Sequence, residues 1–170
     1  YLFTRDKDYL QDIYDLMKGA AEFCLGLLME DKETGYLVTC PSTSPENHFL
    51  CPEDRIQTGV SAGSAGDTQI LRALFRDCLR AQAILQVDSA FGHHLSEALE
   101  RLPQHRIGRF GQLQEWLEDF DETPGEITHR HVSHLFALYP DDDITPTKTP
   151  SLAYAIRECL KRRGEQNLGW

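Results

Sequence analysis

The sequence has no uninterrupted apolar run approaching the roughly 20 residues that a membrane-spanning helix needs, and no signal peptide opens it. Basic residues are also scarce. The 17 Lys and Arg residues stand against 27 Asp and Glu, and the net charge of -10 repels a phosphate backbone. We therefore expect neither a membrane nor nucleic acid as a partner. A content of 41% hydrophobic and 26% charged residues is typical of a globular chain with one modest core.

The five cysteines are an odd number, which excludes a framework in which every cysteine is paired. Cys24, Cys78 and Cys159 fall on apolar helical faces, where we predict small buried side chains. Cys40 and Cys51 instead bracket a proline-rich loop. A disulfide between these two is an open alternative if the protein works outside the cytosol.

Two long helices are predicted in the first half of the chain. Apolar side chains recur at helical spacing over residues 7–30. A second wide apolar face covers residues 67–85, with Asp67 as its N-cap. Between them, residues 36–39 favour a short extended segment, and residues 52–66, rich in Gly, Ser and Pro, favour an irregular loop.

Three shorter helices are predicted in the second half. One covers residues 89–102, and another covers residues 131–139. The last has the clearest boundaries, because Thr149 is a suitable N-cap, Pro150 suits the first helical position and Gly164 follows a basic final turn. Helices separated by long loops predict an all-α toroid or bundle whose loops carry the function.

The loop PSTSPEN, residues 41–47, presents one carboxylate, Glu46, between helical regions. Its two prolines fix φ at their own positions and stiffen the loop. A general acid that cleaves a sugar bond needs a carboxyl held beside the leaving oxygen and partly dried by its neighbours. Glu46 is therefore a candidate acid. The alternative, which composition alone favours, is a solvated carboxylate in a turn.

A second polar cluster comprises GQLQEWLED, residues 111–119, and the later segment HRHVSHL. Glu115 is an alternative acid, and Trp116 is either a core residue or a platform for the apolar face of a sugar. Arg130 and His131 offer donors that suit hydroxyl groups. The three histidines also allow a zinc site, but they lack the HExxH spacing, so we favour hydroxyl recognition.

Five longer segments and a terminal dipeptide follow one another in a distinctive order. They are PSTSPEN, GDTQI, IGRFGQLQEWLEDFDE, HRHVSHLFALYP, TPSLAYAIRECLKRRG and the final GW. Their order and spacing, across nearly the whole chain, resemble glycoside hydrolase family 95, the inverting 1,2-α-L-fucosidases. No single segment is specific by itself, but the succession is.

This resemblance implies an (α/α)6 barrel, of which residues 1–170 would supply central helical hairpins, incomplete at both ends. It implies a fucosylated oligosaccharide as the substrate and a location outside the cell. No metal or other cofactor is expected.

The resemblance also assigns roles to residues of this chain. Glu46 would be the general acid that protonates the glycosidic oxygen, and Arg130 and His131 would bind the fucose. Three further residues are expected to bind substrate or line the pocket: Asn47, Glu115 and Trp116.

Inversion needs a second carboxylate on the opposite face of the sugar ring. In the family this base is implied to be an Asp that follows the terminal GW, assisted by two Asn residues on an earlier segment. The chain has neither segment and begins at Tyr1 rather than Met, so we interpret it as a fragment that is inactive alone. A related α-L-galactosidase, a catalytically dead carbohydrate-binding remnant and a helical interaction scaffold remain alternatives.

Overall fold

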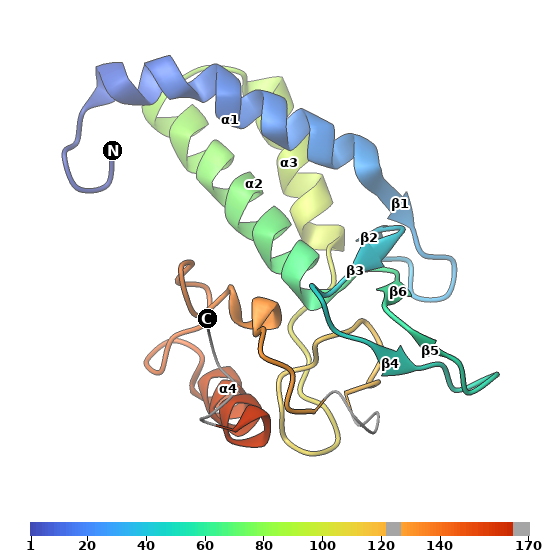
Figure 1. The fold of residues 1–170 in the computed structure, drawn as a ribbon. Coiled ribbons are helices and arrows are strands. Elements are labelled where there is room, and N and C mark those ends of the chain that lie inside the picture. Colours follow the sequence, from blue (N-terminus) through green and yellow to red (C-terminus); the bar gives the residue numbers. More distant parts are fainter. Residues whose placement is uncertain (122–126, 165–170) are drawn as a thin grey trace.

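The computed structural model describes residues 1–121 and 127–164, and the terminal GW lies outside these ranges. Figure 1 shows a layer of three helices above a region of short strands and loops with one further helix. The three upper helices are α1 (Lys7–Leu27), α2 (Ala65–Leu85) and α3 (Ser89–Arg101). The lower region holds the 3₁₀ turn η1 (Ser133–Leu135) and helix α4 (Pro150–Arg163).

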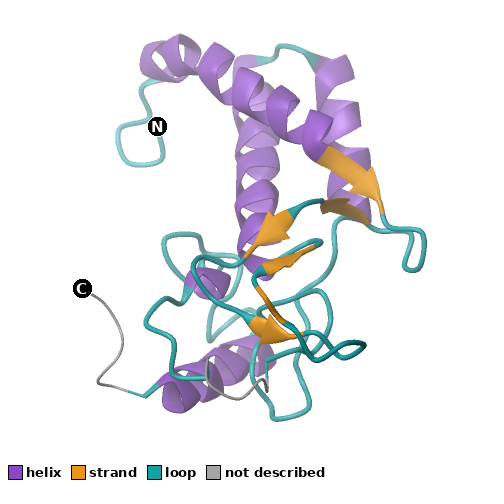
Figure 2. Ribbon diagram, turned by 45° about the vertical axis from the view of Figure 1, so that its right-hand side comes forward, coloured by secondary structure: helices purple, strands orange, loops and turns teal. Residues whose placement is uncertain are grey.

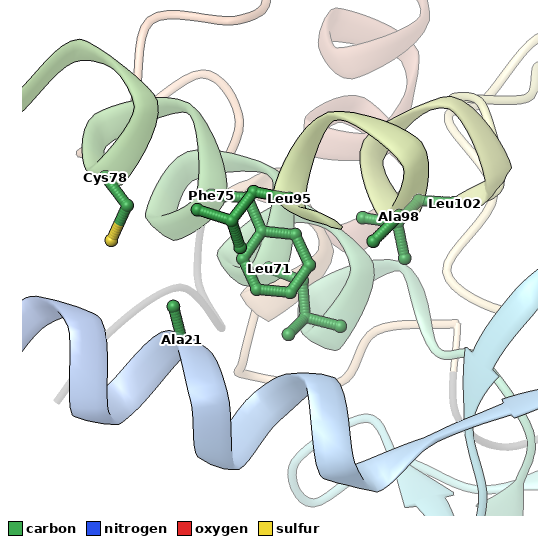
Figure 3. Close-up of a cluster of buried hydrophobic side chains, with 7 residues drawn as sticks. All are labelled: Ala21, Leu71, Phe75, Cys78, Leu95, Ala98 and Leu102. Atoms are coloured by element: carbon green, nitrogen blue, oxygen red, sulfur yellow. The ribbon is translucent and has the colours of Figure 1, made fainter. Parts of the chain in front are cut away.

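The core of the helical layer lies where α1, α2 and α3 meet, and Figure 3 shows its side chains converging between the three helices. Phe75 of α2 is completely buried there. Burying a side chain of this size contributes on the order of 2 kcal/mol. The buried members of the cluster are Ala21, Leu71, Phe75, Cys78, Leu95, Ala98 and Leu102. A separate core joins α4 to the loops beneath the helical layer.

Six short strands form three antiparallel pairs, drawn as arrows in Figure 2. They are β1 (Leu28–Glu30) with β2 (Leu37–Thr39), β3 (Ser42–Thr43) with β6 (Val60–Ser61), and β4 (Phe49–Leu50) with β5 (Gln57–Thr58). β3 and β4 lie on either side of the segment that carries Glu46. The strand pairs therefore fix both ends of that segment.

The prediction of one helix over residues 7–30 is wrong at its end. The helix stops at Leu27, and Leu28 turns into an extended conformation. The next residues pair with β2, which places Met29 opposite Val38, a buried residue. The predicted irregular loop over residues 52–66 is also partly wrong, since it contains β5, β6 and the first residues of α2.

Ser64, and not Asp67, is the N-cap of α2. The Ser64 hydroxyl accepts a hydrogen bond from the Asp67 backbone N–H at 3.3 Å. The Asp67 carboxylate accepts from the hydroxyls of Thr39 at 2.9 Å and Ser42 at 2.7 Å. Its role is thus to tie the segment before Glu46 to the start of α2.

The predicted helix over residues 131–139 is reduced to the single turn η1. The cause is Gln69, a buried residue of α2. Its amide nitrogen donates to the His134 carbonyl at 2.6 Å, and its amide oxygen accepts from the Ala137 N–H at 2.9 Å. A side chain therefore takes the backbone groups that a continuing helix would have used. The predicted helices over residues 89–102 and from Pro150 onward are confirmed.

Helices make up most of the regular structure, so the all-α prediction holds except for the short strands, of which only β2 was expected, as the extended segment over residues 36–39. The closed barrel stays a prediction. Cys40 and Cys51 are free thiols, so the disulfide alternative is wrong. Cys78 and Cys159 are buried as predicted, and Cys24 is half-buried. No helix in the described ranges is long and apolar enough to cross a membrane.

Candidate active site

Glu46 sits on a tight turn formed by residues 44–47. The Asn47 backbone N–H donates to the Ser44 carbonyl at 2.7 Å and closes the turn. Ser44 and Asn47 are buried, whereas the Glu46 side chain is 64% exposed. The turn therefore has buried polar ends and presents its carboxylate outward.

The exposed carboxylate meets the HRH segment, which lies 84 residues further along the chain. The Arg130 guanidinium donates to the Glu46 carboxylate, and the His131 Nε2 atom lies 3.4 Å from the same oxygen. The structure thus brings the Glu46 carboxylate together with an Arg/His pair from a distant segment.

Glu46, Arg130 and His131 line one open cavity of about 530 Å³. The other lining residues are Pro45, Val132, Ser133, Phe136 and Tyr139. The cavity lining combines charged and hydrogen-bonding groups with two aromatic side chains. Its volume lies within the usual range for ligand sites in proteins.

A second carboxylate, Glu115, lies buried behind the turn and is only 2% exposed. Its Oε1 atom accepts from the Ser44 hydroxyl at 2.6 Å. Its Oε2 atom accepts from the Asn47 amide at 2.7 Å and from the Arg163 guanidinium. Glu115 thus contacts both ends of the turn that carries Glu46.

The Glu115 carboxylate is ionised in this buried setting. Burial by itself would raise its pKa, but attraction to Arg163 and the hydrogen bonds from Ser44 and Asn47 lower the pKa below the ordinary value. A protonated His134 would add to this lowering. Burial, however, brings the pKa of His134 down to about 4, so the ring is neutral near pH 7. We therefore assign Arg163 as the cation that balances Glu115.

Asp121 lies beside this network and has the opposite behaviour. Its carboxylate accepts from the Glu115 backbone N–H at 3.1 Å and from the Gln112 amide at 3.2 Å. Burial, strengthened by repulsion from Glu115 and Asp119, raises the pKa of Asp121 to about 7. Between about pH 4 and pH 7, Asp121 is therefore mostly protonated in the folded protein and mostly ionised in the unfolded chain.

Asp121 should make the folded protein less stable as the pH rises. Its folded-state pKa is raised, so its contribution to stability falls as pH climbs from about 4 to 7 and then stays low. We expect Asp121→Asn to remove this dependence, by on the order of 2 kcal/mol between pH 5 and pH 8. Urea unfolding of both proteins at both pH values measures the free energies of unfolding. Parallel pH profiles for the two proteins would contradict the shift.

Trp116 lies apart from the open cavity. It is 2% exposed, and its ring centroid is 4.9 Å from that of Phe49. Phe49 in turn stacks on Phe120 at 4.4 Å. Trp116 is thus a core residue in this structure, and its contact with a sugar stays a prediction, as do direct contacts for the buried Glu115 and Asn47.

Two histidines of the HRHVSH segment lie near each other, and the third is buried beside Glu115. The rings of His129 and His131 lie 5.3 Å apart, and His131 faces Glu46. His134 is buried, with its Nδ1 atom 3.8 Å from Glu115. Among the described residues, no group of three or more His, Cys, Asp or Glu side chains could hold a metal ion.

Comparison with known proteins decides the family. Residues 1–170 match the model of the glycosyl hydrolase family 95 catalytic domain over their whole length. The chain belongs to this family. It is 41% identical to alpha-L-fucosidase 2 of Arabidopsis thaliana over 173 aligned residues, which cover 100% of this chain and 20% of that protein.

Two fungal relatives of the family 95 chain are also similar. A probable alpha-fucosidase A of Aspergillus niger is 32% identical, over 96% of this chain and 22% of the relative. A protein of the same description from Aspergillus oryzae is 30% identical, over 81% of this chain and 19% of the relative. The family 95 chain thus spans about a fifth of the length of each relative.

Three residues that contact the Glu46 turn or its Glu115 partner are not marked by the sequence: Ser44, Ser133 and Arg163. Ser44 and Ser133 belong to two of the segments that carry the family resemblance, but no local pattern distinguishes their hydroxyls, which lie 3.1 Å apart. For Arg163 the sequence indicates only a favourable charge at a helix end. Its partner Glu115 lies 48 residues earlier, and no local pattern connects the two.

Proposed function

We propose that this family 95 chain forms the acid-bearing part of an α-L-fucosidase that removes terminal 1,2-linked α-L-fucose with inversion. The observation that carries the proposal is the convergence of Glu46, Arg130 and His131 on one open cavity. The three relatives described above are named as fucosidases, and the 1,2-linkage and inversion rest on the family resemblance.

In the proposed reaction, Glu46 gives its proton to the glycosidic oxygen as the bond from that oxygen to the anomeric carbon breaks. A water molecule attacks the anomeric carbon from the opposite face and loses its proton to a base. Arg130 and His131 donate hydrogen bonds to sugar hydroxyls and keep the sugar beside Glu46. The aromatic side chains of Phe136 and Tyr139 in the cavity lining suit the apolar face of a sugar.

The general base of this reaction is not supplied by the described residues that line the cavity. Glu46 is the only carboxylate among the described residues that line the cavity. Inverting glycosidases keep their two carboxyl groups about 6.5–9.5 Å apart, to leave room for the water. The family resemblance supports an Asp that follows the terminal GW in this role.

The presence of one carboxylate at the cavity favours a second candidate function, which is carbohydrate binding without hydrolysis. Arg130 and His131 would serve that function equally well. The candidates differ in whether a base completes the site.

The test uses a full-length family 95 protein that contains this region. We expect it to release fucose from a 2-linked fucosyl oligosaccharide, with the β-anomer of L-fucose appearing first in proton NMR spectra. First appearance of the α-anomer would contradict inversion. Binding of the oligosaccharide without release would support the carbohydrate-binding candidate, and faster cleavage of an α-L-galactoside would reassign the sugar.

A further inference from the structure

The buried Glu115 carboxylate is held by hydrogen bonds from several segments of the chain. Three donors converge on its two oxygens, namely the Ser44 hydroxyl, the Asn47 amide and the Arg163 guanidinium. Two of these donors flank Glu46 at the first and last positions of a four-residue turn. One carboxylate therefore holds the turn at both ends.

The backbone of Glu115 is itself held in place. Its carbonyl accepts from the N–H of Ala65, the first residue of α2, at 3.0 Å. Its N–H donates to Asp121 at 3.1 Å. Arg163, which meets the side chain, is the last residue of α4. Glu115 thus connects the turn to α2 and α4, each of which packs in one of the two cores.

The same network reaches the opposite wall of the cavity. Ser44 has one hydroxyl proton, which it donates to Glu115, so at the 3.1 Å contact it accepts from the Ser133 hydroxyl. Ser133 follows His131 by two residues and lines the cavity. The Glu46 turn and the HRH segment are therefore joined through Ser44 behind the cavity as well as through ion pairs within it.

We propose that Glu115 is a positioning residue for proton transfer by Glu46, and that it does not contact the sugar. Its carboxylate fixes Ser44 and Asn47, and thereby the direction in which Glu46 points. This inference rests on the proposed role of Glu46 as the acid. Glu115 would then affect the rate of proton transfer and not the affinity for the substrate.

Substrates that differ only in their leaving group separate these roles. A sugar leaving group needs a proton from the general acid, whereas fluoride leaves without one. Poor positioning of Glu46 should therefore slow cleavage of a 2-linked oligosaccharide and spare α-L-fucosyl fluoride. Loss of a sugar contact would raise KM for both substrates, and partial unfolding would lower both rates equally.

Glu115→Gln in the full-length protein is the first variant. Its amide supplies one acceptor where three donors converge. Either the Ser44 hydroxyl must accept from the new N–H instead of donating, or the Asn47 amide and the Arg163 guanidinium face that N–H and lose their bonds. We expect kcat on the oligosaccharide to fall about 10- to 100-fold, with KM and the fluoride rate close to wild type. Equal losses on both substrates, or a rise in KM alone, would overturn the proposal.

Ser44→Ala provides a milder second variant, should Glu115→Gln fold poorly. It removes one of the two bonds to the turn, and we expect the same selective loss at a smaller magnitude. Ser61→Ala is the matched control, because Ser61 lies opposite Ser42 in the β3–β6 pair but its hydroxyl has no hydrogen-bond partner among the described residues. Selectivity for the oligosaccharide in the Ser61 variant, or its absence in the Ser44 variant, would contradict the proposal.

Glu46→Gln is assayed beside these variants, so that the two proposals can fail separately. If Glu46→Gln loses activity on the oligosaccharide but not on the fluoride, and Glu115→Gln shows no such selective loss, Glu46 would remain the acid and the positioning role of Glu115 would be refuted. Normal cleavage of the oligosaccharide by Glu46→Gln would instead refute Glu46 as the acid.

Discussion

Replacing Glu46 with Gln is expected to lower the rate of release of 2-linked fucose at least about 100-fold in a full-length family 95 protein. The amide keeps the size of the carboxyl group and its place beside Arg130 and His131, but it has no proton to give to the leaving oxygen. The side chain is exposed, so the fold should be unaffected. Steady-state kinetics together with a thermal unfolding curve measure both expectations.

Glu53→Gln is the control for this experiment. Glu53 is an exposed carboxylate on the same stretch of chain, and it contacts Cys51 rather than the cavity. Its replacement should leave the rate unchanged. A normal rate for Glu46→Gln would move the acid to another carboxylate, and an equal loss in both variants would indicate a general effect of charge.

Arg163→Met should produce the largest loss of stability among single changes near the site. The Arg163 side chain is 7% exposed and pairs with Glu115, so the variant leaves a buried carboxylate without its compensating cation. Breaking such a pair costs about 3–5 kcal/mol. Met keeps the length and apolar stem of Arg, which limits the contribution from lost packing. Chemical denaturation at neutral pH measures the effect.

The loss in Arg163→Met should depend on pH in a definite direction. Pairing lowers the folded-state pKa of Glu115, so the stability it provides is present above the ordinary Glu pKa and is lost as the pH falls through the lower value. In the variant, burial favours the protonated form of Glu115. The difference between the two proteins should therefore be largest at neutral pH and shrink on acidification.

Two further variants check this interpretation. Arg157→Met removes an arginine from the same helix, where it lies over the exposed ring of Tyr154, and should cost little. Glu115→Gln combined with Arg163→Met removes both charges and should recover much of the lost stability. A double variant less stable than Arg163→Met alone would show that packing, and not the unpaired charge, causes the loss.

Sequence reasoning succeeded where the controlling interactions are local. The end of α4 at Gly164 and its start at Pro150 follow from backbone preferences of those residues alone. It failed at residues 28–30, whose strand conformation depends on a partner strand, and at residues 131–139, whose helix is prevented by Gln69 of α2. Periodicity cannot register a competitor that lies 65 residues away.

In the candidate site, too, sequence reasoning found some residues and missed the surroundings of others. Glu46, Arg130 and His131 were identified through the resemblance, and the structure brings them together. The sequence offers a core position for Trp116 only as one of two alternatives and gives no sign that Glu115 is buried, because an acidic or aromatic residue in a loop has no periodic pattern that tells a buried position from an exposed one. Their surroundings come from segments on both sides of them in the sequence.

Helix α2 also acts as a rigid spacer between the two walls of the cavity. Asp67 holds the segment before Glu46, while Arg76 donates to Asp141 and Asp143, just beyond the HRH segment. Arg76 follows Asp67 by nine positions, which corresponds to about 13.5 Å along the helix. One residue more or less in this stretch would turn one anchor about 100° around the axis relative to the other. Related chains should therefore vary in length in their surface hairpins, such as the one between β4 and β5, and keep this part of α2 constant.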